Sequence, residues 1–263
     1  MLVTAEVRGA PCWLSLMTHD LAAAQRFYGA VLGWTFRPAG LGSAFCVAEA
    51  DGLPVAGIGG IAGELAVPVA WTAYFSVDDA DRAVARVRER GGTVGVGPVS
   101  YPLHGRAALV ADRHGASFGL WEGSVLAGWS VGSTSPAWLE LRTRDAFDAA
   151  LFYGEVLEWA EQTPGCCEAF YEEDQVVLRA EGLAVARLNS GHVEAAAEKP
   201  YERPRWLIHF HVPDLASATH RALAHGATAF PDLPATHGTG VTLRDPQGAL
   251  FTLDQTPTTK PEG

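Results

Sequence analysis

Residues 11–34 read PCWLSLMTHDLAAAQRFYGAVLGW, and residues 136–159 read PAWLELRTRDAFDAALFYGEVLEW. The two stretches align without a gap, and both contain FYG-x-VL-x-W at the same distance after an Asp. Self-similarity of this kind decides the architecture before any local pattern does. The separation between the copies is the length of a small domain, so we expect a duplicated domain rather than a solenoid.

The repeated stretch predicts a strand followed by a capped helix. Residues 13–18 form a short apolar run with polar insertions, which is typical of a strand with one covered face. Asp20 can accept the free amide hydrogens of the first helical turn and is the predicted N-cap. Apolar residues then recur at helical spacing, and Gly33 predicts the end of the helix in the first copy. Glu158 stands at the equivalent place in the second copy, which leaves the end of that helix open.

A weaker repeat follows in each half. Residues 71–92 and 206–226 each predict a strand, an Asp cap, a helix and a glycine stop. Hairpins are predicted at residues 105–121 and 238–254, and their central DRHG and DPQG sequences have good turn chemistry. The chain therefore reads as four similar modules in two pairs.

These motifs resemble the vicinal oxygen chelate superfamily, which includes glyoxalases, bleomycin-resistance proteins and extradiol dioxygenases. The resemblance covers residues 11–122 and 136–255. It implies an α+β fold of two tandem domains, each a pair of βαβββ modules forming a half-open barrel. We expect the two domains to pack independently. The expected boundaries are 1–122 for the N-terminal glyoxalase-like domain, 123–135 for the linker, 136–256 for the C-terminal glyoxalase-like domain and 257–263 for the tail.

Composition narrows the range of partners. The net charge is −11 and only Lys199 and Lys260 are lysines, which argues against nucleic acid because phosphate binding needs clustered basic residues. No apolar run approaches the roughly 20 residues of a membrane span. The N-terminus lacks the pattern of a secretion signal, and the four cysteines have no C-x-x-C spacing. We therefore expect a cytoplasmic protein with a small-molecule ligand, as a monomer or homodimer, and no membrane partner.

In metal-dependent relatives, the resemblance implies a divalent ion inside each barrel, held by His, Gln or Glu from the first and last strands of the modules. None of the residues at these positions is a competent ligand, apart from two weak threonine hydroxyls. We therefore expect neither the usual metal nor another cofactor. The positions are Trp13, Thr72 and Gly119 in the first domain, and Trp138, Leu207 and Thr252 in the second.

Strand alternation indicates what lines each barrel instead, because alternate residues share a face. In the first domain, the residues on the barrel-facing side of the strands are here called the first cup. They are mostly aromatic with some hydroxyl groups, and they suit a flat apolar ligand. The alternative is that the same side chains simply fill the core. Trp13, Tyr74 and Trp121 are the candidate ligand-binding residues. The first cup comprises Trp13, Ser15, Met17, Thr72, Tyr74, Ser76, Gly119 and Trp121.

The corresponding set in the second domain, the second cup, is more polar. Glu140, His209 and His211 are the candidate catalytic residues, since two histidines and a carboxylate could bind a transition metal or form a base with its orienting partner. The alternative is a buried hydrogen-bonded network in which Glu140 neutralises Arg142. The candidate ligand-binding residues here are Trp138, Arg142 and Asp254. The second cup comprises Trp138, Glu140, Arg142, Leu207, His209, His211, Thr252 and Asp254.

Two functional hypotheses follow. The first is a protein of the sequestration or resistance type that binds a small apolar or aromatic molecule without chemistry. The second is an enzyme, of the lyase, isomerase or hydroxylase/dioxygenase-like kind, acting from the second cup. The sequence names neither the ligand nor a reaction.

Overall fold

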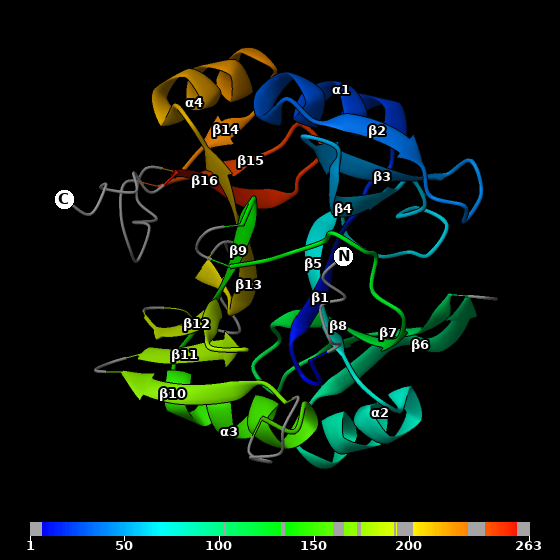
Figure 1. Ribbon diagram of the computed structural model, residues 1–263, viewed down its shortest axis with the longest axis vertical. Coiled ribbons are helices and arrows are strands. Elements are labelled where there is room, and N and C mark those ends of the chain that lie inside the picture. The colour runs from blue at the N-terminus through cyan, green and yellow to red at the C-terminus, as the bar shows by residue number, and fades with distance from the viewer. Residues whose placement is uncertain are drawn as a thin grey trace.

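The computed structural model describes residues 7–101, 104–132, 135–159, 166–172, 175–191, 193, 202–230 and 240–256. Within these residues the chain forms two eight-stranded mixed sheets that are curved but not closed, with helices at both ends (Figure 1). Both sheets have the same strand order, so the expected tandem α+β duplication is confirmed.

Each sheet is two βαβββ modules joined edge to edge. The first strands of the two modules, β1 and β5 or β9 and β13, pair antiparallel at the centre, while each closing strand runs parallel to its own first strand. The first sheet has the order β2 (Thr35–Pro38), β3 (Phe45–Ala50), β4 (Leu53–Gly59), β1 (Pro11–Met17), β5 (Ala70–Ser76), β8 (Ser117–Gly123), β7 (Gly105–Ala111) and β6 (Thr93–Tyr101). The second has the order β10 (Glu168–Glu172), β11 (Gln175–Ala180), β12 (Leu183–Ser190), β9 (Ala137–Thr143), β13 (Arg205–Val212), β16 (Leu250–Gln255), β15 (Val241–Arg244) and β14 (Thr228–Ala229).

All four predicted helices form, and each begins at its predicted aspartate. The carboxylate of each cap accepts the amide hydrogen of the third residue after it, at 2.9–3.0 Å. This satisfies one of the amide groups that a helix N-terminus leaves without an intrahelical partner. None of the described helices is both long and apolar enough to cross a membrane. The helices are α1 (Leu21–Leu32), α2 (Ala80–Glu89), α3 (Ala146–Val156) and α4 (Leu215–Ala224).

Helix α3 ends in the same way as α1, with Glu158 in the place of Gly33. Gly33 ends α1 in the left-handed region at φ 71°, and Glu158 adopts the same conformation at φ 63°. A residue with a Cβ pays about 1–2 kcal/mol for this conformation. The Glu158 carboxylate lies 2.8 Å from Nη1 of Arg86 on α2. This ion pair links the two halves.

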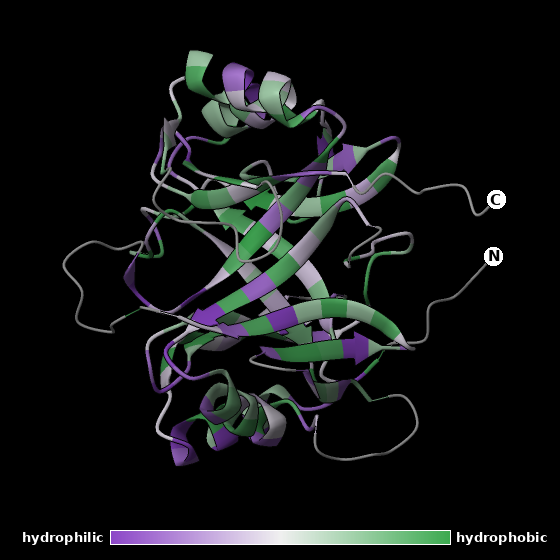
Figure 2. Ribbon diagram, turned by 90° about the vertical axis from the view of Figure 1, so that its left-hand side faces the viewer, coloured by the Kyte–Doolittle hydropathy of each residue, from purple (hydrophilic) through white to green (hydrophobic). Residues whose placement is uncertain are grey.

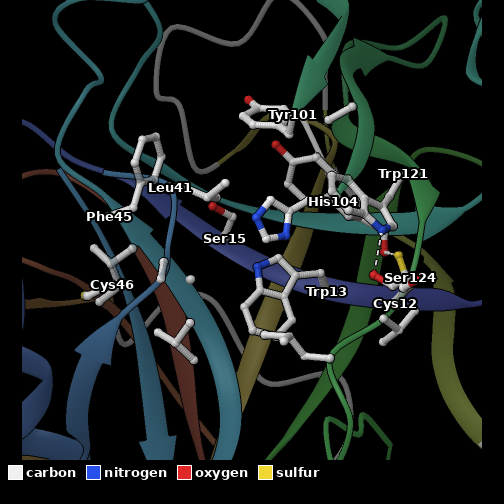
Figure 3. A pocket seen from close by; sticks show the side chains of 18 of the residues that line it. Cys12, Trp13, Ser15, Leu41, Phe45, Cys46, Tyr101, His104, Trp121 and Ser124 are labelled. Carbon is white, nitrogen blue, oxygen red and sulfur yellow. Dashed lines mark hydrogen bonds between the residues drawn. The ribbon is translucent and has the colours of Figure 1, made fainter. Parts of the chain in front are cut away.

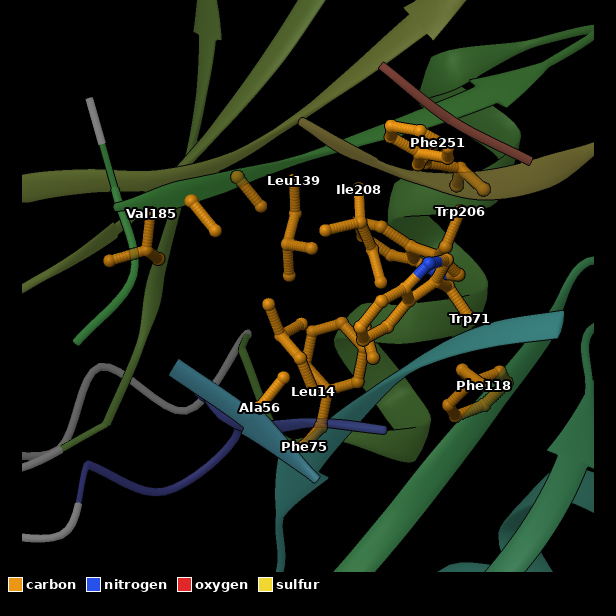
Figure 4. Packing of buried hydrophobic residues seen from close by; sticks show 14 of the residues in the cluster. Leu14, Ala56, Trp71, Phe75, Phe118, Leu139, Val185, Trp206, Ile208 and Phe251 are labelled. Atoms are coloured by element: carbon orange, nitrogen blue, oxygen red, sulfur yellow. The ribbon is translucent and has the colours of Figure 1, made fainter. Parts of the chain in front are cut away.

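The expectation that the two domains pack independently is wrong. The sheet faces opposite the cups press against each other and form one hydrophobic core, which includes Leu14, Phe75, Leu139 and Ile208 (Figure 4). At one end of the molecule α1 lies against α4, and at the other α2 lies against α3 (Figure 1). Along the central strands hydrophobic and hydrophilic residues alternate (Figure 2), because one strand face meets this core and the other meets a cup.

Two buried hydrogen bonds cross between the halves in a reciprocal way. The Tyr28 hydroxyl of the first FYG motif donates to Oδ2 of Asp245, in the hairpin turn of the second half, at 2.9 Å. The Tyr153 hydroxyl of the second FYG motif donates to Oδ2 of Asp112, in the hairpin turn of the first half, at 3.0 Å. Each tyrosine oxygen also accepts an indole N–H, from Trp71 or from its counterpart on β13. The repeated motifs therefore hold the two halves together.

We predict that Tyr28→Phe lowers the free energy of unfolding by about 1–3 kcal/mol, because one buried carboxylate oxygen loses its donor. Urea unfolding followed by fluorescence and by circular dichroism measures this. Because the core is shared, both halves should unfold in a single transition that moves as a whole.

The matched control is Tyr171→Phe, since Tyr171 is exposed and its hydroxyl lies outside the core. This variant should unfold like the parent. Two separate transitions, of which Tyr28→Phe shifts only one, would contradict the shared core.

Candidate functional site

The first cup contains a cavity of about 280 Å³ (Figure 3). Its wall includes all three residues proposed from the sequence, Trp13 on β1, Tyr74 on β5 and Trp121 on β8. The side chains of this cup therefore do not fill it completely. Such a volume is at the small end of ligand sites, which are usually mostly apolar with a few polar groups.

Two glycines make room for the aromatic side chains. A Cβ at Gly119 would lie 2.1 Å from Cδ1 of Tyr74, and a Cβ at Gly57 would lie 2.9 Å from Nε1 of Trp13. Both distances are far below van der Waals contact, so larger residues at these positions would displace the rings. Glycine at positions 57 and 119 therefore leaves the room that the aromatic walls of the cavity need.

Polar groups are few and point inward. Figure 3 shows the Ser15 hydroxyl, the His104 imidazole and the indole nitrogen of Trp13 turned toward the middle of the cavity. Burial raises the pKa of the Tyr74 phenol, and the neighbouring Tyr101 adds to the shift. The Tyr74 hydroxyl therefore keeps its proton at neutral pH and can donate a hydrogen bond to a ligand.

Strand alternation along the first and last strands missed part of the wall. Phe45 at the start of β3, Tyr101 at the end of β6 and Leu126 after β8 also line the cavity. These residues lie on an outer strand, on an edge strand and in the predicted linker, respectively. How these three segments bend toward the cup depends on tertiary packing. No strand is predicted from the sequence at residues 93–101, so there is no local signal for Tyr101.

The residues at the superfamily's metal positions do not fit a divalent ion. In the first cup the ring of Tyr74 occupies the space into which a side chain at Gly119 would project. In the second cup the equivalent positions carry Trp138, Leu207 and Thr252, which are not a ligand set. In the described part of the chain, no group of three or more His, Cys, Asp or Glu side chains is arranged to hold a metal.

The second cup holds a buried charge cluster. Nδ1 of His209 lies 2.9 Å from Oδ2 of Asp254, and its Nε2 lies 3.0 Å from Oε2 of Glu140. Oε1 of Glu140 accepts from Arg142 and from Asn189, each at 3.2 Å. His209 and Glu140 are fully buried. This arrangement matches the hydrogen-bonded network that the sequence left open as one alternative, in which Glu140 pairs with Arg142.

The carboxylates on both sides of His209 change the pKa of its imidazole. Burial by itself lowers the pKa of this imidazole, but the hydrogen bonds and charges of Asp254 and Glu140 outweigh burial and raise the pKa above its ordinary value. Trp138 stacks on the ring with centroids 4.0 Å apart, and its indole N–H donates to Asp254 at 2.7 Å. His209 thus lies between two carboxylates that favour its protonated form.

His211 does not join this cluster. Its Nδ1 lies 2.6 Å from the backbone oxygen of Ser135, just before β9, and the side chain is half-buried. The structure brings together Glu140 and His209 of the proposed catalytic group, and adds Asp254, Trp138 and Arg142 of the proposed ligand-binding group. Alternation along β13 puts His211 on the same sheet face as His209, but its partner depends on how the chain enters β9.

We predict that purified protein holds no stoichiometric zinc, nickel, manganese or iron, because Trp13, Gly119 and Leu207 offer no donor atom where the superfamily places its ligands. Elemental analysis by inductively coupled plasma mass spectrometry measures this. One tightly bound ion per half would contradict the assignment.

The raised pKa of His209 makes stability depend on pH. Its contribution to the free energy of unfolding is complete below about pH 6.5, the ordinary histidine pKa, and is lost as pH rises through the higher folded-state pKa. Urea unfolding at a series of pH values should show this loss. His209→Gln should remove it from the difference profile, whereas His220→Gln, at an exposed histidine, should retain it. Identical profiles for His209→Gln and the parent would refute a cationic His209.

Comparisons with known proteins agree with this description. Residues 138–253 match the family of the glyoxalase-like domain, and residues 12–44 match the bleomycin resistance protein-like N-terminal family. The anthracycline biosynthesis protein DauV of Streptomyces sp. strain C5 is 30% identical over an alignment 268 residues long. The alignment covers 93% of this chain and 92% of DauV.

Solved structures show the same fold at low identity. The 2,3-dioxygenase LapB from Pseudomonas sp. KL28 has a TM-score of 0.57 and 12% identity, over 98% of this chain and 96% of LapB. The Mn(II)-bound glyoxalase from Novosphingobium aromaticivorans has a TM-score of 0.55 and 14% identity, over 95% of this chain and 82% of that protein. With the duplicated βαβββ modules and the full-length similarity to DauV, these matches show that the chain belongs to the vicinal oxygen chelate superfamily, among its glyoxalase-like and bleomycin-resistance-like members.

Proposed function

We propose that this protein binds a small, flat, mostly apolar molecule in the first cup. The observation that carries the proposal is the cavity of about 280 Å³ between Trp13, Tyr74 and Trp121. Aromatic walls with a few inward-facing donors favour an aromatic ligand that carries acceptor oxygens, such as a phenol or a quinone.

Burial of apolar surface supplies the driving force. At about 25 cal/mol per Å², removing about 200 Å² of ligand surface from water gives roughly 5 kcal/mol before other terms. Loss of translational and side-chain freedom reduces this figure. A Kd of about 0.2 mM or weaker is therefore expected for a single ring system, with the Tyr74 hydroxyl adding orientation rather than most of the energy.

Two of the relatives, DauV and DnrV of Streptomyces peucetius, are named for anthracycline biosynthesis. Anthracyclines are flat, fused-ring aromatic molecules, and this chemical class agrees with the proposed ligand. The similarity to DauV covers both cups of this chain. A ligand of this chemical class fits the aromatic wall and donors of the first cup, with part of a larger ring system extending beyond the cavity.

The alternative is an enzyme that works from the second cup. The close contact between Glu140 and His209 supports a proton-holding pair. However, both imidazole nitrogens face carboxylates, so His209 has no free nitrogen to act as a base. This arrangement makes binding in the first cup the better-supported function.

We predict that Trp121→Ala weakens the binding of naphthol at least tenfold, which corresponds to about 1.4 kcal/mol. The indole forms one wall of the cavity, so its loss removes apolar contact with the ligand. Isothermal titration calorimetry with the parent and the variant measures the change in Kd.

His211→Ala is the matched control, because this half-buried side chain belongs to the second cup. It should leave the Kd for naphthol unchanged. The opposite pattern, with binding lost in His211→Ala and kept in Trp121→Ala, would move the ligand to the second sheet and favour the enzymatic alternative.

A further inference from the structure

The cup face of the second sheet carries a group of arginines, although the net charge of the chain is −11. Arg142 on β9 and Arg205 on β13 are direct partners in the antiparallel register of these strands. Arg187 on β12 pairs with Glu140, and Arg244 ends β15. The four arginines are here called the arginine cluster.

Contacts and alternation place Arg142 and Arg205 on the cup face. Arg142 donates to Glu140, which in turn contacts His209, so these side chains share one face of the sheet. Arg205 lies on the same strand as His209 at an even spacing, and the register between them has no shift. Alternation therefore directs Arg205 to the face of His209.

The other two arginines follow by the same reasoning. Asn189 donates to Glu140, and Arg187 is the alternate residue before it on β12. Thr242 contacts a cup threonine of β16 at 3.2 Å, and Arg244 is the alternate residue after it on β15. All four members of the cluster are half-buried.

This arrangement is unfavourable without a counter-ion. Like charges directly opposite each other on paired strands are destabilising. Burial lowers the pKa of Arg205 to about 10, and repulsion from Arg142, Arg203 and Arg244 adds to the shift. Because Arg142 is paired with Glu140, the repulsion in this register acts mainly on Arg205.

The carboxylates of the second cup do not balance the cluster. Glu140 contacts Arg142 and His209, and Asp254 contacts His209. Among the described residues, none forms a salt bridge with Arg187, Arg205 or Arg244. Nε of Arg205 donates to the backbone oxygen of Arg203 at 3.2 Å, and Cζ of Arg244 lies 5.0 Å from the ring centroid of Phe230. The cluster therefore presents excess positive charge to the inside of the cup.

We propose that the second cup binds the oxyanion of a small organic molecule, a carboxylate or a phosphate, through Arg205 and Arg244 with Arg142 and Arg187 beside them. Guanidinium groups match both oxyanions in planar, two-bond geometry. The half-buried position on a concave face favours a small anion over a nucleic acid or an acidic protein surface. This site is separate from the apolar cavity, and the protein thus has two cups with different ligand chemistry.

The test measures binding of sodium phosphate and sodium benzoate to the full chain by calorimetry and thermal unfolding, at ionic strength matched with sodium chloride. At least one of the two anions should bind and raise the Tm of the parent, because a ligand of the folded state stabilises it by mass action. The anion that binds more tightly identifies the phosphate or the carboxylate as the preferred group. Arg205→Gln and Arg244→Gln should each raise its Kd at least tenfold.

Without anion, Arg205→Gln should be at least as stable as the parent, since the change removes repulsion with Arg142. The matched control is Arg88→Gln, which removes the same charge from an exposed position on α2. This control should bind the anion like the parent. Naphthol binding in the first cup should be unchanged in Arg205→Gln, which separates failure of this inference from failure of the proposed function.

Three results would overturn the inference. One is the absence of binding by either anion to the parent. Another is an equal loss of affinity in Arg88→Gln and Arg205→Gln, which would indicate a general effect of net charge. The third is a strong destabilisation of anion-free Arg205→Gln, because Arg205 would then serve the fold rather than a ligand.

Discussion

The structure depends on a reciprocal exchange of buried hydrogen bonds between its two halves. Tyr28 reaches the hairpin turn at Asp245, and Tyr153 reaches the hairpin turn at Asp112. Each aspartate also accepts backbone amide hydrogens of its own turn through the other oxygen. A buried carboxylate that loses such a donor costs more than the bond contributes, so the four groups fix how the halves meet.

This constraint decides which faces remain available for ligands. Because the shared core joins the faces that carry Leu14, Phe75 and Ile208, the opposite faces point away from it as two cups. One cup holds the aromatic cavity around Trp13, and the other holds the buried charge cluster around His209.

Much of the fold was predictable because its signals are local. Four Asp N-caps predicted the four helices, and Asp and Gly at a fixed spacing predicted the two hairpin turns. The candidate side chains Trp13, Tyr74 and Trp121 could be assigned to one face because alternation along a strand is a geometric rule. Whether that face was hollow or filled could not be predicted, since the answer depends on Gly57 and Gly119 meeting rings from neighbouring strands.

The sequence by itself determined the duplication, the module order and the alternation of faces along the central strands, because repeats, caps and alternation act over short distances along the chain. Only the tertiary structure decided that the halves share one core, since Tyr28 and Asp245 are far apart in sequence and nothing local indicates their contact. It alone also decided that Arg142 faces Arg205, because strand register is set by packing across the whole sheet. Candidate residues such as Trp13 and His209 could therefore be named in advance, whereas the places of Phe45, Tyr101 and Arg205 depend on the three-dimensional arrangement.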